Sequence, residues 1–143
     1  MSRIGNHAFM RKFTEFLNTA SPKLAAELIA PEAVFRPVIT GRVHKGAEGY
    51  LEILAVLGAG FPDAHWELRE VVGEGNVLAA RFCISGTHGG EFQGIAATGR
   101  PVRISAINLY RLKHGRLARE FDQFDNLSLL WQMGVYPPLA GKR

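Results

Sequence analysis

Side chains able to carry protons gather in the last third of the sequence. Asp125 ends a segment of strand periodicity that begins at Leu117, and it shares a strand face with Phe121. A carboxylate beside an apolar hollow has a raised pKa and can act as a general acid or base. Asp122 is the competing carboxylate, and on a regular strand its side chain faces the opposite way.

Asp125 also has a purely structural interpretation. Helical spacing begins at Leu127 and ends before Gly134, and Asp125 stands where an N-cap residue would stand, with Ser128 three residues further on. The sequence alone therefore leaves cap and catalyst open for this residue, and it favours a solvated or ion-paired role for Asp122.

Further polar side chains precede this segment. Asn108 and Tyr110 alternate onto one face of the penultimate strand, where both could donate hydrogen bonds to an enolate oxygen. A buried amide must find partners, so Asn108 is either a cavity residue or a structural hydrogen bonder. His88, in a Gly-Thr-His-Gly-Gly loop, is expected at the cavity rim as a donor or proton carrier. His44 and His65 are expected at the surface.

The elements that position these residues are helices in the first half of the chain and strands in the second. Apolar spacing and capping residues predict helices at 6–17, from Ser21-Pro22 to Pro31, and at 47–58. Alternation and turn residues predict strands at 34–38, 64–70, 77–85, 91–95, 102–112 and 117–124. This order predicts an α+β fold, with N-terminal helices packed on a strongly curved, mainly antiparallel sheet around a cone-shaped cavity.

Composition limits the classes of function. The 143 residues predict a single domain over 1–143, and 47% apolar content is typical of a globular protein. The single cysteine favours a reducing cytoplasm, and no spacing of His or Cys suggests a metal site. The net charge of +4 is scattered, which argues against nucleic-acid binding, and no apolar run is long enough to span a membrane.

Several phrases then carry a family resemblance. In order they are FPDAHWEL, VVGEGNVLAARF, SGTHGGEFQGIAATGRPV, INLYRLKHGRLAREFDQFD and LLWQMG. Together they resemble the SnoaL-like polyketide cyclases of the nuclear transport factor 2-like superfamily, over about residues 61–134. The resemblance implies a cone-shaped α+β barrel, a homodimer formed through the open sheet face, and a cofactor-free intramolecular aldol reaction that closes a ring of an aromatic polyketide ester.

In that family an aspartate near the end of the last long strand acts as acid and base, and Asp125 is the residue that we match to it. We therefore expect Asp125 and Asn108 to be catalytic. Four other residues are expected to contact a small, apolar, carbonyl-bearing substrate: Tyr110, His88, Phe121 and Trp66.

Two other functions remain open at this stage. The same cavity could serve an isomerase or an epoxide-hydrolase-like enzyme, which would use Asp125 with Tyr110 or a bound water. The chain could also be a non-catalytic module that binds a small ligand or another protein, because one fold hosts both kinds of protein.

Overall fold

The computed structural model describes residues 3–136, so both ends of the domain predicted over 1–143 lie outside the described residues. The helices are α1 (Arg3–Thr19), α2 (Pro22–Leu28), α3 (Gly46–Gly60) and α4 (Asn126–Gln132). The strands are β1 (Val34–Phe35), β2 (His44–Lys45), β3 (His65–Glu74), β4 (Val77–Thr87), β5 (Pro101–Lys113) and β6 (Arg116–Phe124). No helix among these residues is both long and apolar enough to cross a bilayer.

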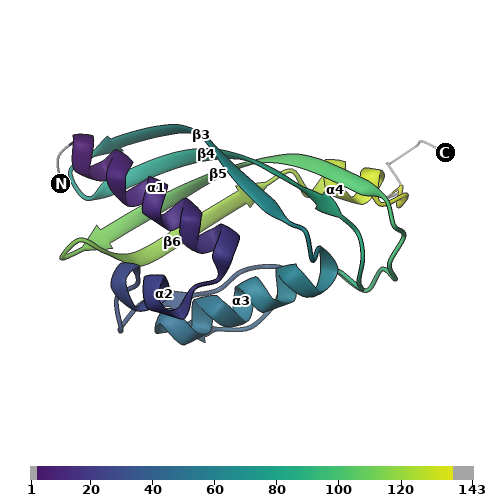
Figure 1. Ribbon diagram of the computed structural model, residues 1–143, viewed down its shortest axis with the longest axis horizontal. Helices are drawn as coiled ribbons and strands as arrows, with labels where there is room; N and C mark the ends of the chain where they lie inside the picture. The colour runs from purple at the N-terminus through teal and green to yellow at the C-terminus, as the bar shows by residue number, and fades with distance from the viewer. Residues whose placement is uncertain (1–2, 137–143) are drawn as a thin grey trace, which may run out of the picture.

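The main sheet is an antiparallel meander in the order β3-β4-β5-β6, and β1 pairs with β2 in a separate small sheet. Figure 1 shows the long strands curving together around α1, with α2 and α3 beneath them. The α+β fold predicted from the sequence is confirmed, but the sheet stays open and does not close into a barrel.

The first helix fills the inside of this curve with aromatic rings. Phe9, Phe13 and Phe16 are buried on one face of α1, as their spacing predicts. The Phe13 ring meets Tyr50 of α3 and Tyr110 of β5 edge-on, each with 5.5 Å between ring centroids. These contacts join α1, α3 and the sheet in one core on the inner side of the curved sheet.

A β-bulge in the last hairpin decides which side chains of β6 point inward. Leu117 lies opposite Leu112, but the next aligned pair is Arg119 with Arg111, so Ala118 is an extra residue on β6. An extra residue reverses the alternation of faces. Beyond the bulge the inward positions of β6 are therefore the even-numbered ones. Leu117 points inward, but Phe121, which regular alternation would place on the same face, points outward.

Two segments predicted as strands differ in the structure, one by being shorter and one by being a turn. The strand predicted over 34–38 is only Val34–Phe35, and Pro37 begins a turn in which the backbone N–H groups of Thr40 and Gly41 donate to its carbonyl. The strand predicted over 91–95 is instead a tight turn closed by a single bridge between Phe92 and Ile95.

The expectation that His44 lies at the surface is wrong, whereas His65 is exposed as predicted. His44 is 1% exposed because α3 crosses directly over it at Gly49, where a Cβ atom would come within 2.7 Å of the His44 carbonyl carbon. Its Nδ1 lies 3.0 Å from Glu52 and its Nε2 lies 2.8 Å from the Thr40 hydroxyl. The buried imidazole thus ties the 36–43 loop to α3.

Candidate functional site

A cavity of about 670 Å³ lies between the inner face of the sheet and α3. Most of its wall is apolar and much of it is aromatic, including Leu54, Phe61, Trp66, Ile84, Ile104 and Phe124. One side of its rim is the free edge of β6, and the other is the loop from Arg36 to Ile39, whose Val38 is 93% exposed. The volume is in the range of pockets that hold drug-sized ligands.

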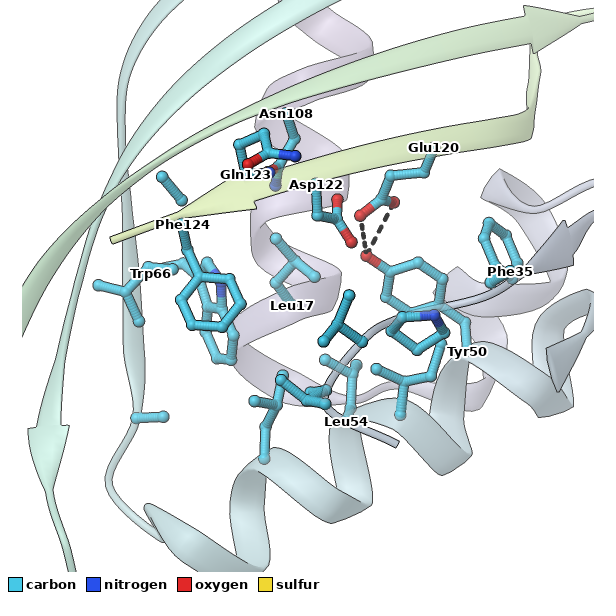
Figure 2. A pocket seen from close by; sticks show the side chains of 18 of the residues that line it. Leu17, Phe35, Tyr50, Leu54, Trp66, Asn108, Glu120, Asp122, Gln123 and Phe124 are labelled. Carbon is cyan, nitrogen blue, oxygen red and sulfur yellow. Dashed lines mark hydrogen bonds between the residues drawn. The ribbon is translucent and has the colours of Figure 1, made fainter. Parts of the chain in front are cut away.

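Two carboxylates of β6 face this cavity from adjacent inward positions. Glu120 lies opposite Tyr110 of β5, and Asp122 lies opposite Asn108. Directly opposed residues of an antiparallel pair point to the same face, so these four side chains share the inner surface. Figure 2 shows Glu120 and Asp122 side by side on β6, both directed into the pocket.

Tyr50 of α3 fixes the inner carboxylate. Its hydroxyl donates to Glu120, at 2.9 Å from Oε1 and 3.1 Å from Oε2 (Figure 2). Burial and the negative charge of Glu120 raise the pKa of Tyr50 well above its usual value, so the phenol stays protonated and remains a donor.

The pKa of Glu120 is raised well above that of a free glutamate. Burial is the largest cause, and the neighbouring Asp122 carboxylate is the next. The Tyr50 hydroxyl acts in the opposite direction, because it stabilises the ionised carboxylate. A glutamic acid that keeps its proton to a higher pH than a free glutamate can act as a general acid.

Asn108 and Tyr110 form a second polar link on β5. The Asn108 amide nitrogen donates to the Tyr110 hydroxyl at 3.1 Å, and the Asn108 oxygen accepts from the backbone N–H of Gln123 at 3.3 Å. Asn108 lines the cavity, as one of its two interpretations required. Tyr110 is fully buried beneath it and is not among the residues that line the cavity, which differs from the position expected for this side chain.

Asp125 does not lie in the cavity wall, which corrects the position expected for it. Its side chain caps α4 by accepting from the backbone N–H of Ser128 at 3.0 Å, and it is exposed. The structural interpretation of this residue is thus the one observed. Asp122 is exposed, in keeping with the solvated role favoured for it, but the bulge at Ala118 turns it toward the cavity and not away from it.

His88 does not stand at the rim either. It is fully buried, with its ring against Phe61 at 5.4 Å between centroids. Its Nδ1 accepts the backbone N–H of Thr98 at 3.3 Å and lies 2.9 Å from the Thr98 hydroxyl. His88 therefore joins the ends of the 88–98 loop and is not among the residues that line the cavity.

The two remaining predicted residues do line the cavity. Trp66 is buried in its wall, and Phe121 lies at its rim with 49% of its surface exposed. Phe121 belongs to the outward-facing positions of β6, and the Arg119 guanidinium lies 5.3 Å from its ring centroid.

Glu120 and Tyr50 are the site residues that the sequence analysis missed. Glu120 shares its strand face with Asp122, so recognition of the bulge would have found both carboxylates together. Tyr50 lies within the helix predicted over 47–58, and no local signal links it to a residue 70 positions later in the chain.

A family model described as SnoaL-like polyketide cyclase matches residues 7–133. This chain belongs to the SnoaL-like polyketide cyclase family. No curated protein matches its sequence significantly.

Solved structures support the same assignment. TsrD from Streptomyces laurentii is 26% identical with a TM-score of 0.83, and the match covers 94% of this chain and 98% of TsrD. IdmH from Streptomyces antibioticus, described as a candidate polyketide cyclase, is 30% identical with a TM-score of 0.78, over 91% of this chain and 99% of IdmH. AclR from Streptomyces galilaeus, described as a candidate hydroxylase, is 21% identical with a TM-score of 0.79, over 96% of this chain and 86% of AclR, which shows the shared fold alone.

Proposed function

We propose that this protein is a cofactor-independent acid/base enzyme that cyclises a polyketide or a related apolar carbonyl compound by an aldol-type reaction. The observation that carries this proposal is the pair of carboxyl groups, Glu120 and Asp122, that faces an apolar cavity from one strand. The raised pKa of Glu120 supports an acid beside a base. In this proposal Asp122 takes the role that the sequence suggested for Asp125.

The reaction needs two proton transfers. Asp122, as carboxylate, takes a proton from a carbon next to a carbonyl group, and the electron pair moves to the carbonyl oxygen. The enolate carbon then attacks a second carbonyl of the same molecule, and protonated Glu120 delivers its proton to the new alkoxide. A single general acid or base of this kind typically accelerates a reaction by about 10²- to 10⁴-fold.

Neighbouring groups support these two roles. The Asn108 amide carries a second N–H beyond the one that it donates to Tyr110, and this N–H is available to an enolate oxygen. Tyr50 holds the Glu120 carboxyl in place from the opposite side. Trp66 and Phe124 provide an apolar wall for a flat ring system.

Proton abstraction can be tested without knowing the natural substrate. Methyl 2-naphthylacetate carries an acidic CH₂ between an aromatic ring and an ester carbonyl. Wild-type protein in D₂O should exchange these two hydrogens for deuterium, as followed by proton NMR. Asp122→Asn should lower the exchange rate at least about 100-fold, which is the lower range for loss of a general base.

Asp125→Asn is the matched control, because it removes the same charge three residues away and Asn is an equally good N-cap. It should exchange at the wild-type rate. Equal loss in both variants, or exchange that persists in Asp122→Asn, would contradict the assignment of Asp122 as the base.

Isomerisation is the second candidate, favoured by the raised pKa of Glu120 beside a second carboxyl group, Asp122. Ketosteroid isomerase uses a protonated Asp as one donor to its enolate while another Asp moves the proton. Both reactions begin with the same exchange, so the product separates them: a new carbon–carbon bond for the cyclase, a shifted double bond for the isomerase.

We also propose a homodimer that acts in the cytoplasm. The outward face of the sheet exposes Val72, Ile107 and Phe121, which a second copy would cover. Light scattering during gel filtration tests this, with twice the mass of the 15.7 kDa chain expected. Ile107→Lys should yield monomers, whereas a wild-type mass of one chain would refute the dimer.

A further inference from the structure

The buried imidazole of His44 lies outside the cavity wall and joins three parts of the fold. Its strand, β2, pairs with β1, where Phe35 is the residue directly opposite. Its Nδ1 lies 3.0 Å from Glu52 of α3, and its Nε2 lies 2.8 Å from the Thr40 hydroxyl in the 36–43 loop. The Glu52 carboxylate can only accept, so Nδ1 donates to it and Nε2 of the neutral ring accepts from Thr40. With both ring nitrogens bonded, the imidazole has a fixed position and orientation.

Helix α3 touches this histidine through a glycine. A Cβ atom at Gly49 would lie 2.7 Å from the carbonyl carbon of His44, 3.0 Å from its Cβ and 3.2 Å from its Cα. The first of these separations is shorter than a side chain tolerates, and the obstructing atom belongs to the backbone, which cannot rotate away. Glycine at position 49 therefore allows α3 to lie closer to β2 than any other residue would.

Tyr50 follows Gly49 in the helix, so its position depends on this close approach. Its ring packs edge-on against Phe35 at 5.0 Å between centroids, and its hydroxyl donates to Glu120 at 2.9 Å (Figure 2). Hydrogen bonds between two oxygen atoms are normally about 2.5–3.0 Å long. The bond to Glu120 is near the upper end of that range, so a displacement of α3 from β2 would weaken it.

We propose that His44 is a positioning residue of the site, which sets how closely α3 approaches β2 and so holds the Tyr50 hydroxyl against Glu120. This inference rests on the proposed function, in which Glu120 is the acid. It adds a group outside the cavity that determines the acidity of this carboxyl group without contact with a ligand.

Two glycines of α3 provide a matched pair of variants. Gly49→Ala and Gly58→Ala each add one methyl group to the same helix and raise its helix propensity alike. The new methyl group would meet the His44 backbone at position 49, whereas at position 58 nothing lies within 4 Å. Gly49→Ala should therefore displace α3 from β2, and Gly58→Ala should leave it in place.

Carbon-detected NMR over a pH series gives the pKa of Glu120 in each variant. In Gly49→Ala this pKa should rise, because the ionised carboxylate loses part of its donor, and the rise should not exceed that in Tyr50→Phe. In Gly58→Ala it should equal the wild-type value. An unchanged pKa in Gly49→Ala, or an equal rise in both glycine variants, would overturn the inference.

A double variant tests whether the effect passes through the Tyr50 hydroxyl. In the Tyr50→Phe background the hydroxyl is already absent, so Gly49→Ala should cause no further rise in the pKa of Glu120. A rise of the same size with and without the hydroxyl would show that α3 acts on Glu120 by another route and would overturn the assigned role of His44.

Glu52→Ala tests the same link without disturbing the contact at Gly49, so it also serves if Gly49→Ala fails to fold. The Glu52 side chain is 62% exposed, and its removal takes away the acceptor of His44 Nδ1. The pKa of Glu120 should rise, and Glu52→Gln, which keeps an acceptor oxygen, should restore it. Loss of a negative charge alone would lower this pKa, so an unchanged or lowered value in Glu52→Ala would contradict the inference.

Deuterium exchange into methyl 2-naphthylacetate separates this inference from the proposed function. If the pKa of Glu120 follows the expected pattern and wild type does not exchange, His44 positions Tyr50 and the acid/base proposal fails. If exchange depends on Asp122 but the pKa of Glu120 is the same in wild type and Gly49→Ala, the acid/base proposal stands and the positioning role of His44 is wrong.

Discussion

Removal of the Tyr50 hydroxyl is the most informative perturbation of the carboxyl pair. In Tyr50→Phe the ring should stay where it is, because it packs edge-on against Phe35 and Phe13 at centroid distances of 5.0 and 5.5 Å. The change therefore removes one group, the hydroxyl that lies 2.9 and 3.1 Å from the two Glu120 oxygens.

Two quantities should change. Loss of one hydrogen bond should lower the free energy of unfolding by about 1 kcal/mol, or about 3–4 °C in Tm for a domain of this size. The pKa of Glu120, already raised by burial and by Asp122, should rise further, because the hydroxyl stabilises the ionised carboxylate. The acid of the pair should then stay protonated to a higher pH.

Carbon-detected NMR of the carboxyl groups measures the pKa of Glu120 directly, with a pH series on wild type and variant. Tyr110→Phe is the matched control, since its hydroxyl accepts from Asn108 and does not donate to Glu120 in this structure. A Glu120 pKa that falls in Tyr50→Phe, or that rises equally in both variants, would refute the assigned hydrogen bond.

Three further changes have expected outcomes. The pKa of Glu120 is higher in the folded state than its unfolded value of about 4.3. The stability that Glu120 contributes is therefore complete below about pH 4.3 and is lost as the pH rises through the folded pKa. Across that pH range Glu120→Gln should become more stable relative to wild type, as measured by denaturant melts at a series of pH values. Asp125→Ala removes the acceptor for the Ser128 N–H and should lower the free energy of unfolding by about 1 kcal/mol in the same melts. The rate of deuterium exchange into the ester should not change. A fall in that rate while the variant is still folded would contradict a purely structural role. Thr40→Val leaves the buried Nε2 of His44 without a partner and should cost about 1–3 kcal/mol, which Thr40→Ser should recover; failure of Ser to recover it would show that the methyl group matters instead.

Much of the fold follows from local signals. The aromatic stripe of Phe9, Phe13 and Phe16 predicts the first helix and its buried face, and the Lys113-His114-Gly115 turn predicts the last hairpin. The cap on α4 also follows, because Asp125 and Ser128 have the spacing that an N-cap requires.

The site was less predictable, because it depends on pairing between distant parts of the chain. The inward face of β6 was inferred by regular alternation, and one extra residue at Ala118 reversed it. The partner of Glu120 comes from α3, and the burial of His44 depends on how closely α3 crosses it at Gly49. Neither contact leaves a periodic pattern in the sequence.

A crystal structure with methyl 2-naphthylacetate bound would show whether Asp122 meets the reacting carbon. We expect the naphthalene ring to lie against Trp66 and Phe124, with the carbon between ring and ester about 3–3.5 Å from the Asp122 carboxylate. A ligand that occupies the cavity with this carbon turned away from Asp122 and Glu120, or that binds only outside the cavity, would contradict it.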